Sequence, residues 1–405
     1  MKMTIVAMEI PYPPIHGGRV DVWRRVKMLA EQGTEIQLVC WSRETPNPDS
    51  LNVIHQYVKD FYPIIYQRGL DACIRRVFDL FSYPLEVTSR IVRGEKWKRL
   101  LDSVGCFQPD VILCDQIHSG WVASRLSKAL EIPMIVRSHN IEHLHYRYYL
   151  QCARGYQKLV RLLSLNHLEK YEKSLLKQSL AFYDISKDDL QFWQKQGFNN
   201  GYFLPPLIEF DAEYERKSHG RRGTRNLQNS KFYDVVFLGN LNSENNVEGV
   251  TWFVEKVFPI LQKQLPSIKV MIAGSNPVSK ILEICSNKEG IDLKINPPCA
   301  LKIYQSGRVL INPIPTGSGV SIKSIDMLAI GQPIVSRPKG LFGLSEEARQ
   351  YFRVASDARS FANQIINCLG EEQPNMPDRA LLESLFGYPV IQNFLFQLDS
   401  LLQQH

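Results

Sequence analysis

The stretch that decides the fold covers residues 315–335 and reads PTGSGVSIKSIDMLAIGQPIV. A short apolar strand is expected just before it, at residues 309–312, and a second apolar strand at its end. Between the strands, a glycine-rich turn leads into a helix of about three turns that ends at Gly331. The free N–H groups and the positive dipole end of this helix point at whatever lies above the strand ends, and a phosphate or diphosphate suits that place.

Two side chains make this turn more specific. Lys323 and Asp326 lie one helical turn apart and therefore share a face. A lysine there can contact phosphate oxygens, while a carboxylate can accept hydrogen bonds from both hydroxyls of a ribose. A glycine-rich turn alone also serves packing and tight turns. Together with Lys323 and Asp326, it predicts a binding site for a nucleoside diphosphate.

Strands and helices alternate in two series along the chain, and a polar, glycine-containing segment separates the series. Such alternation implies right-handed crossovers and parallel sheets, whose ligands bind outside the carboxyl ends of the strands. One long basic helix is expected at residues 156–178. The predicted fold class is α/β, with two facing, Rossmann-like, doubly wound domains. The predicted parts are an N-terminal domain over residues 1–210, a basic linker over 211–230, a C-terminal domain over 231–380 and a final helix over 381–405.

The chain has 405 residues and a formal net charge of +7. No aromatic stacking platform accompanies the cations of the linker, so nucleic-acid binding is not expected. No apolar run reaches the roughly 18 residues of a membrane span, and the apolar start of the chain is too short for a secretion signal, which predicts a cytoplasmic protein. The linker and the basic segment at residues 154–165 leave open a peripheral contact with an anionic membrane at its inner face.

The block at residues 315–335 resembles the C-terminal signature of glycosyltransferase family 4, the retaining GT-B enzymes. Asp326 stands where that family usually has Glu, and Ser318 stands where many members have the first Glu of a two-glutamate motif. The resemblance implies a GT-B architecture in which the N-terminal domain binds the acceptor, the C-terminal domain binds the nucleotide sugar, and the final helix crosses back to the first domain. It also implies transfer of a sugar from a nucleoside-diphosphate sugar to a glycan, lipid-linked or other small acceptor, as in polysaccharide biosynthesis.

Two N-terminal blocks strengthen the resemblance, which covers nearly the whole chain. The loop with Gly17, Gly18 and Arg19 follows the first strand, and the family places this loop against the donor diphosphate and sugar. His139 follows a later strand and matches the family motif HNxE, with Glu142 as its acidic residue. The resemblance implies that His139 hydrogen-bonds the transferred sugar or shapes the acceptor pocket, and that Glu142 orders this loop.

The first turn of the second domain departs from many family members, because asparagines replace the usual Arg and Lys. Charge compensation of the diphosphate is therefore expected from Lys323, the helix N-terminus and Arg19. The predicted catalytic residues are His139 and Lys323. The predicted donor-binding residues are Gly17, Gly18, Arg19, Gly239, Asn240, Gly317, Ser318, Gly319, Val320, Lys323 and Asp326, with Glu142, Asn246 and Gly340 as further candidates.

No DxD-like pair ends a strand, so no metal site is expected, and no cofactor is expected beside the donor substrate. Since Asp326 is assigned to ribose, no carboxylate offers itself as a nucleophile. A same-face substitution through an oxocarbenium-like transition state fits better. Two alternatives stay open: a sugar-nucleotide 2-epimerase of GT-B fold, and a non-catalytic partner that binds a nucleotide sugar and regulates a transferase.

Overall fold

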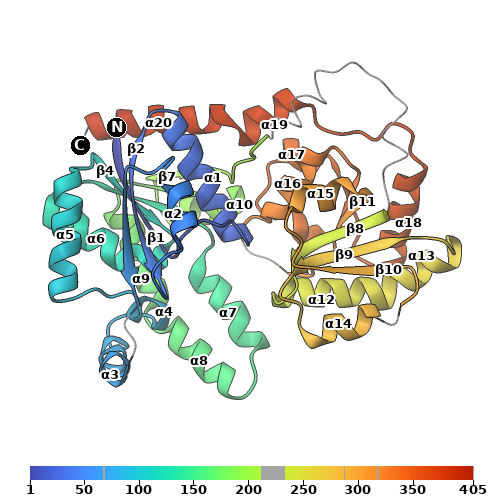
Figure 1. Cartoon of the computed structure of the whole chain (residues 1–405), viewed down its shortest axis with the longest axis horizontal. Helices are drawn as coiled ribbons and strands as arrows, with labels where there is room; N and C mark the ends of the chain where they lie inside the picture. Colours follow the sequence, from blue (N-terminus) through green and yellow to red (C-terminus); the bar gives the residue numbers. More distant parts are fainter. Residues whose placement is uncertain (67–68, 211–232, 287, 317–318, 405) are drawn as a thin grey trace. The chain divides into compact units, whose positions relative to one another are not determined.

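The computed structural model describes residues 1–66, 69–210, 233–286, 288–316 and 319–404 (Figure 1). It divides the chain into two compact units, and each is described by itself. Unit 1 consists of Met1–Pro205 and Tyr388–His405, and unit 2 consists of Pro206–Gly387. The predicted linker lies outside the described residues, and the division falls just before it.

Unit 1 is built on a parallel sheet of seven strands in the order β3-β2-β1-β4-β5-β6-β7. Sequential strands lead away from β1 in both directions, so the carboxyl ends of β1 and β4 flank the point where the strand order reverses, which is where such sheets bind ligands. The strands are β1 (Lys2–Ala7), β2 (Glu35–Ser42), β3 (Asp60–Ile65), β4 (Val111–Asp115), β5 (Met134–Ser138), β6 (Ala181–Asp184) and β7 (Gly201–Phe203).

Helices cover both faces of this sheet (Figure 1). The central strands β1, β4 and β5 read as near-continuous apolar runs because both faces are buried, as parallel sheets require. The helices of unit 1 are α1 (Gly17–Glu31), α2 (Pro48–Ile54), α3 (Leu70–Asp79), α4 (Leu85–Thr88), α5 (Glu95–Phe107), η1 (Ile117–Ser119), α6 (Gly120–Leu130), α7 (Glu142–Cys152), α8 (Tyr156–Leu165), α9 (Leu168–Gln178), α10 (Lys187–Lys195) and α20 (Tyr388–Gln403).

The prediction of one helix over residues 156–178 is wrong, because the chain breaks between α8 and α9. His167 has a left-handed backbone with φ of 60°. The side chain of Asn166 donates a hydrogen bond to the carbonyl of Leu80 at 3.0 Å, which fixes the break against the segment after α3. Helical periodicity continues across this turn, so the pattern alone could not locate it.

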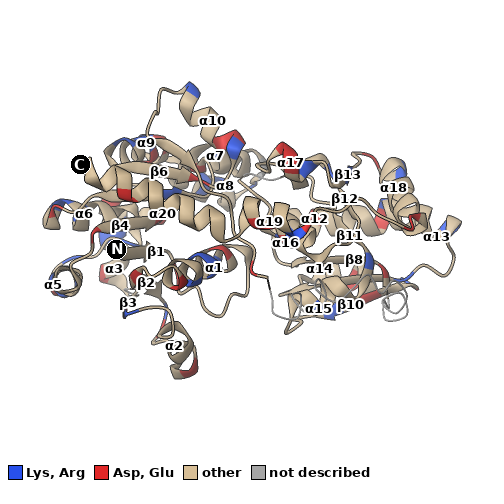
Figure 2. Cartoon of the chain, turned by 90° about the horizontal axis from the view of Figure 1, so that it is seen from above, with Lys and Arg blue, Asp and Glu red and all other residues tan. Residues whose placement is uncertain are grey.

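The end of the chain returns to unit 1, as predicted, but in two helices. Helix α19 (Arg379–Phe386) belongs to unit 2 and α20 to unit 1, with Gly387 between them. Figure 2 shows α20 almost entirely tan, since Asp399 is its only charged residue. The hydroxyl of Tyr388 donates to Glu31 of α1 at 2.6 Å, and the ring of Phe394 packs edge-on against Tyr183.

Unit 2 repeats the scheme with a parallel sheet of six strands in the order β10-β9-β8-β11-β12-β13. The predicted α/β class with two Rossmann-like sheets is therefore confirmed. Its strands are β8 (Tyr233–Asn240), β9 (Val270–Ser275), β10 (Ile291–Ile295), β11 (Gly307–Asn312), β12 (Ile334–Ser336) and β13 (Phe352–Val354). Its helices are α12 (Glu244–Trp252), η3 (Phe253–Val257), α13 (Phe258–Gln264), α14 (Ser279–Ser286), α15 (Ala300–Gln305), α16 (Ile322–Ile330), η4 (Pro338–Leu341), α17 (Glu346–Arg349), α18 (Ala358–Gly370) and α19.

Residues 244–264 form a continuous helical run of α12, a π-helical turn and α13. Pro259 stands at the start of α13 and has no N–H to donate. Its ring would also clash with the carbonyl one turn earlier in an ideal helix. The wider π-helical turn ahead of Pro259 accommodates both the missing N–H and the ring, so the helix continues.

Candidate functional site

In unit 2, the carboxyl end of β8 meets the first turn of α12. The side-chain amide of Asn246 donates to the carbonyl of Asn240 at 2.9 Å. A Cβ atom added to Gly239 would lie 3.0 Å from the Nδ2 atom of Asn246, so glycine at this position allows the close approach. Three predicted residues, Gly239, Asn240 and Asn246, are thus in contact at the edge of the sheet where ligands bind.

Lys323 completes this group from the first turn of α16. Its Nζ atom donates to the Oδ1 atom of Asn246 at 2.6 Å and lies 4.7 Å from the ring centroid of Phe237. Burial lowers the pKa of Lys323 to about 7. Within the described part of the chain, an amide and an aromatic ring are its partners, and no carboxylate forms an ion pair with it. An anion bound at Lys323 would supply the missing negative charge and favour the ammonium form.

A buried hydrogen-bond network holds α16 against the loops around it. The side-chain amide of Asn312, at the end of β11, donates to the hydroxyls of Ser321 at 3.2 Å and Ser324 at 2.9 Å. The hydroxyl of Ser324 donates in turn to the carbonyl of Gly340 at 2.7 Å. A Cβ atom on Gly340 would lie 2.2 Å from the Oγ atom of Ser336, so close packing explains this glycine. The network fixes the position from which Lys323 reaches Asn246.

The remaining predicted donor-binding residues of unit 2 surround the same turn. Gly319 has φ of 63°, and Val320 follows it just before α16. Asp326 is half-buried on α16, one turn beyond Lys323. Gly317 and Ser318 lie outside the described residues.

In unit 1, five charged or ionisable side chains form a buried cluster beneath the carboxyl ends of β4 and β5. Arg25 of α1 bonds to Asp21 at 2.7 Å and also to Asp115, the last residue of β4. Arg137 of β5 lies 3.4 Å from the Oδ1 atom of Asp21 and donates to the carbonyls of Leu204 and Pro205. His139 follows β5, and its Nε2 atom lies 2.8 Å from the Oδ1 atom of Asp115.

The charges of this buried cluster compensate one another. Burial alone would raise the pKa of Asp21 and of Asp115, but Arg25 and the other cationic neighbours outweigh it and lower both pKa values. Burial lowers the pKa of Arg137 to about 10, against the opposing effect of Asp21. Two guanidinium groups therefore balance two carboxylates, which is the condition for burying so many charges.

The same geometry assigns the tautomer of His139. Because Asp115 stays ionised, the Nε2 atom of His139 carries the proton and donates it to this carboxylate. The Nδ1 atom then faces the side-chain amide of Gln116 at 3.5 Å and acts as an acceptor. His139 is 8% exposed, so its ring is held firmly at the end of the sheet.

Glu142 lies at the start of α7, next to the carboxylate of Glu172. Burial, followed by the charge of Glu172, raises the pKa of Glu142 to about 8, while a 3.2 Å hydrogen bond from Asn140 acts in the opposite direction. Glu172 itself accepts from the backbone N–H groups of Glu142 at 2.8 Å and His143 at 3.2 Å. Glu172 therefore caps α7.

The loop after β1 gives Arg19 a partner that the sequence did not predict. The Nε atom of Arg19 donates to Glu9 at 2.8 Å, and His16 lies 3.0 Å from the other carboxylate oxygen. Gly17 and Gly18 begin α1. The charge of Arg19 is thus already compensated by Glu9, which leaves Lys323 as the stronger candidate for the diphosphate.

The structure brings together Gly239, Asn240, Asn246 and Lys323 in unit 2, and joins His139 to Asp115 and Asp21 in unit 1. His139 and Lys323 belong to different units. The sequence analysis missed Asp21, Arg25 and Asp115 as partners of His139. A signal was present, since Asp115 ends an apolar strand and Asp21 and Arg25 interrupt the apolar stripe of α1. Among the described residues, no group of three His, Cys, Asp or Glu side chains is placed to hold a metal ion.

No helix within the described ranges is long and apolar enough to span a membrane.

Comparison with known proteins gives a family match in unit 2. Residues 233–371 match the family of glycosyl transferases group 1. An uncharacterized 44.6 kDa protein in the cps region of Klebsiella pneumoniae is 28% identical over 381 residues, which cover 90% of each chain. An uncharacterized glycosyltransferase of Methanocaldococcus jannaschii is 21% identical over 361 residues, which cover 85% of this chain and 82% of the relative.

Solved structures match the whole chain. Sucrose-phosphate synthase from Thermosynechococcus elongatus superposes with a TM-score of 0.67 at 15% identity, over 100% of this chain and 99% of its own. HepE from Anabaena, in complex with UDP, superposes with a TM-score of 0.64 at 10% identity, over 99% of this chain and 100% of its own. At these identities the likeness shows the fold. The chain thus has the GT-B fold, and its residues 233–371 form a domain that matches the glycosyl transferases group 1.

Proposed function

We propose that the protein is a glycosyltransferase that moves a sugar from a nucleoside-diphosphate sugar to a glycan or lipid-linked acceptor. One observation carries this proposal: the side chain of Lys323 is held at the end of a parallel sheet, beside the N-terminus of α16, by a neutral amide and an aromatic ring. A half-buried cation without a paired carboxylate favours a bound anion. The family match over residues 233–371 supports a diphosphate as that anion.

In this proposal unit 2 binds the donor. Lys323 and the first N–H groups of α16 contact the diphosphate, and Asp326 accepts hydrogen bonds from the ribose hydroxyls. Gly319 and Val320 lie in the turn that approaches the phosphates, and Asn240 and Asn246 position the ammonium group. HepE, which has a similar fold, was solved with UDP and with UDP-glucose, so uridine nucleotides are the first probes to use.

The proposed reaction retains the anomeric configuration and needs no divalent metal. As the glycosidic bond breaks, negative charge grows on the leaving diphosphate, and protonated Lys323 together with the dipole of α16 stabilises it. The acceptor hydroxyl attacks from the same face and is hydrogen-bonded to the leaving phosphate. Because Asp115 holds the Nε2 proton, the Nδ1 atom of His139 would accept a hydrogen bond from a sugar hydroxyl that replaces the 3.5 Å contact with Gln116.

The acceptor is proposed to belong to polysaccharide biosynthesis, and the protein to work in the cytoplasm or at the inner face of the membrane. The relative in a cps region of Klebsiella pneumoniae supports the first part. The second part rests on the basic segment at residues 154–165, where α8 places apolar side chains at the surface.

The test has two stages. Thermal-shift and calorimetric titrations with nucleoside diphosphates and nucleotide sugars come first, since a ligand at about 100 times its dissociation constant stabilises by roughly 2.7 kcal/mol. Incubation of the best donor with and without acceptors then separates the activities. Sugar transfer that requires an acceptor supports the proposal, whereas an epimerised donor formed without an acceptor indicates the 2-epimerase. Donor binding without turnover on any acceptor indicates the regulatory partner.

A further inference from the structure

Helix α3 is amphipathic, but its apolar side faces outward. Ala72 and Asp79 are buried against the body of unit 1. The large apolar residues recur at helical spacing and are between 56% and 83% exposed, which is the reverse of an ordinary surface helix. Figure 1 shows α3 projecting from the lower end of unit 1. The exposed apolar stripe consists of Leu70, Ile74, Val77 and Phe78 of the helix and Phe81 just after it.

Helix α8 adds exposed apolar side chains to the same end of unit 1. The short helix α4 packs against both α3 and α8. The hydroxyl of Ser164 in α8 donates to Glu86 of α4 at 2.6 Å, which fixes the two helices together. Tyr156, Leu159 and Leu162 of α8 are each at least half exposed. Two helices that pack on α4 thus both expose large apolar side chains, and exposed apolar surface of this kind marks interaction sites.

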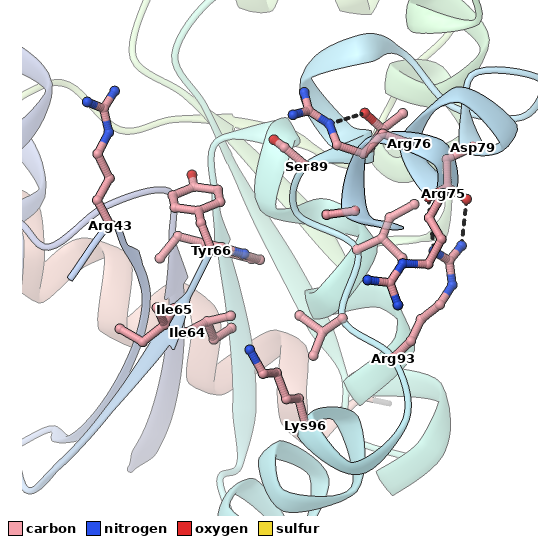
Figure 3. A pocket seen from close by; sticks show the side chains of 15 residues that line it. Arg43, Ile64, Ile65, Tyr66, Arg75, Arg76, Asp79, Ser89, Arg93 and Lys96 are labelled. Atoms are coloured by element: carbon pink, nitrogen blue, oxygen red, sulfur yellow. Dashed lines mark hydrogen bonds and ion pairs between the residues drawn. The ribbon is translucent and has the colours of Figure 1, made fainter. Parts of the chain in front are cut away.

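A basic cavity of about 470 Å³ adjoins the polar side of α3 (Figure 3). Figure 3 shows Arg43 and Tyr66 on one side of the cavity, Arg75, Arg76 and Arg93 on the other, and Lys96 below. Among the described residues that line the cavity, Asp79 is the single carboxylate, and Arg93 binds it through two hydrogen bonds of 2.9 and 2.6 Å. The side chain of Arg76 donates to Thr88 at 3.4 Å. The cavity thus carries a large excess of positive charge.

We propose that this end of unit 1 docks on an anionic lipid membrane. A lipid phosphate would lie in the cavity among Arg43, Arg75 and Lys96, while the apolar stripe of α3 enters the boundary between head groups and acyl chains. A phosphate ester bonded to an apolar chain matches both halves of the surface at once. Charge complementarity therefore selects this occupant over a purely apolar protein partner.

The proposal explains why the polar face of α3 is turned inward. An inward polar face places Arg75 and Arg76 at the cavity, where they meet the phosphate, and leaves the apolar face free for the acyl region. Neither the donor site nor catalysis enters this argument. Vesicle binding without nucleotide can therefore fail or succeed independently of the proposed glycosyl transfer.

The test is flotation of the full chain with vesicles of phosphatidylcholine alone or mixed with phosphatidylglycerol, at low and high salt. We expect binding only to the anionic vesicles and a loss of binding as salt rises. The double variant Arg43→Glu/Lys96→Glu should reduce partitioning at least about 25-fold, since each cation near the surface contributes roughly fivefold. Lys256→Glu/Lys263→Glu, two exposed cations of unit 2, is the matched control and should bind as the parent does.

One variant and one control test the exposed apolar stripe of α3. Phe81→Ser should weaken partitioning roughly tenfold, because the lost side chain would be buried in the interface. Phe396→Ser on α20 is the control, since Phe396 and Phe81 are both 77% exposed. All of these residues are on the surface, so unchanged thermal melts should show that the variants fold.

Three results would overturn the proposal. The first is absence of the parent protein from anionic vesicles at low salt. The second is a dimer in light scattering that Phe81→Ser converts to a monomer, because the apolar surface would then join two copies of the chain. The third is binding of inorganic phosphate that depends on Arg43 and Lys96 without any binding to vesicles, which would indicate a site for a soluble phosphate compound.

Discussion

Binding of UDP should weaken about tenfold when the pH rises from about 8 to about 9, because Lys323 of the free protein is already mostly deprotonated in that range and must take up a proton when UDP binds. Burial lowers the pKa of Lys323 to about 7 in the free protein. A bound diphosphate favours the ammonium form and raises this pKa toward the ordinary lysine value. Above about pH 8, the free protein is mostly deprotonated at Lys323 and the complex is protonated, so binding takes up about one proton.

The diphosphate itself does not confuse this measurement. A terminal phosphate loses its last proton near pH 6, so the diphosphate of UDP is fully ionised throughout the chosen range. The phosphates therefore contribute no pH slope of their own. The direction of the affinity change is fixed by the structure: binding should be tighter at lower pH, because the protonated form of Lys323 is the one that meets the anion.

Calorimetry checks the prediction in two ways. Dissociation constants measured across the range give the pH slope. Titrations in buffers of different ionisation enthalpy at one pH give the number of protons taken up. Lys323→Ala should flatten the pH slope, abolish proton uptake and weaken UDP binding while leaving uridine nearly unaffected. The reasoning fails if the parent binds UDP with no pH slope and no proton uptake, or if Lys323→Ala weakens UDP and uridine equally.

Three further changes test other parts of the two sites. Asp326→Asn should weaken binding of UDP more than of its 2′-deoxy analogue, and equal losses in calorimetry would remove Asp326 from the ribose. Glu142→Gln should become more stabilising as pH rises from about 4.5 toward 8, by on the order of 4 kcal/mol in all, because the raised pKa of Glu142 means that its ionisation opposes folding; a constant difference in chemical denaturation across that range would contradict this. Asp115→Ala should cost about 3–5 kcal/mol of unfolding free energy, since Arg25 loses a buried partner, and a loss below about 1 kcal/mol would show that the cluster tolerates an unpaired charge.

The sequence indicates the central strands of both sheets clearly, but it gives no prediction for two edge strands, β3 and β13. Strands β1, β4 and β5 are short apolar runs between turn signals, which is how a central parallel strand reads. Strand β3 is different because it lies at the edge of the sheet and contains Pro63. A proline is tolerated at an edge, yet it argues against a strand in any reading of the sequence alone.

The residues that we propose for the donor site of unit 2 can be selected from local sequence pattern, but the contacts between them cannot. The glycine-rich turn and the helix that follows it identified Lys323 from local pattern alone. The hydrogen bond between Lys323 and Asn246 joins residues 77 positions apart and depends on how closely α12 approaches α16. The periodic pattern of apolar residues in the sequence does not predict the distance between these two helices. The lowered pKa of Lys323, which carries the main prediction above, follows from this burial and was equally invisible in the sequence.

The buried cluster of unit 1 shows that a sequence can imply a partner for each buried charge without identifying the residue that supplies it. Asp21 and Arg25 fall on the side of α1 that also carries Val22 and Val26, so the apolar pattern already implies that both charges are buried. Buried charges must be compensated, and four residues of spacing lets these two pair with each other. The pair is nevertheless insufficient, because Asp115 also binds Arg25 and holds His139. Only the strand order, which brings the ends of β1, β4 and β5 side by side, supplies Asp115 as the group that fixes the imidazole.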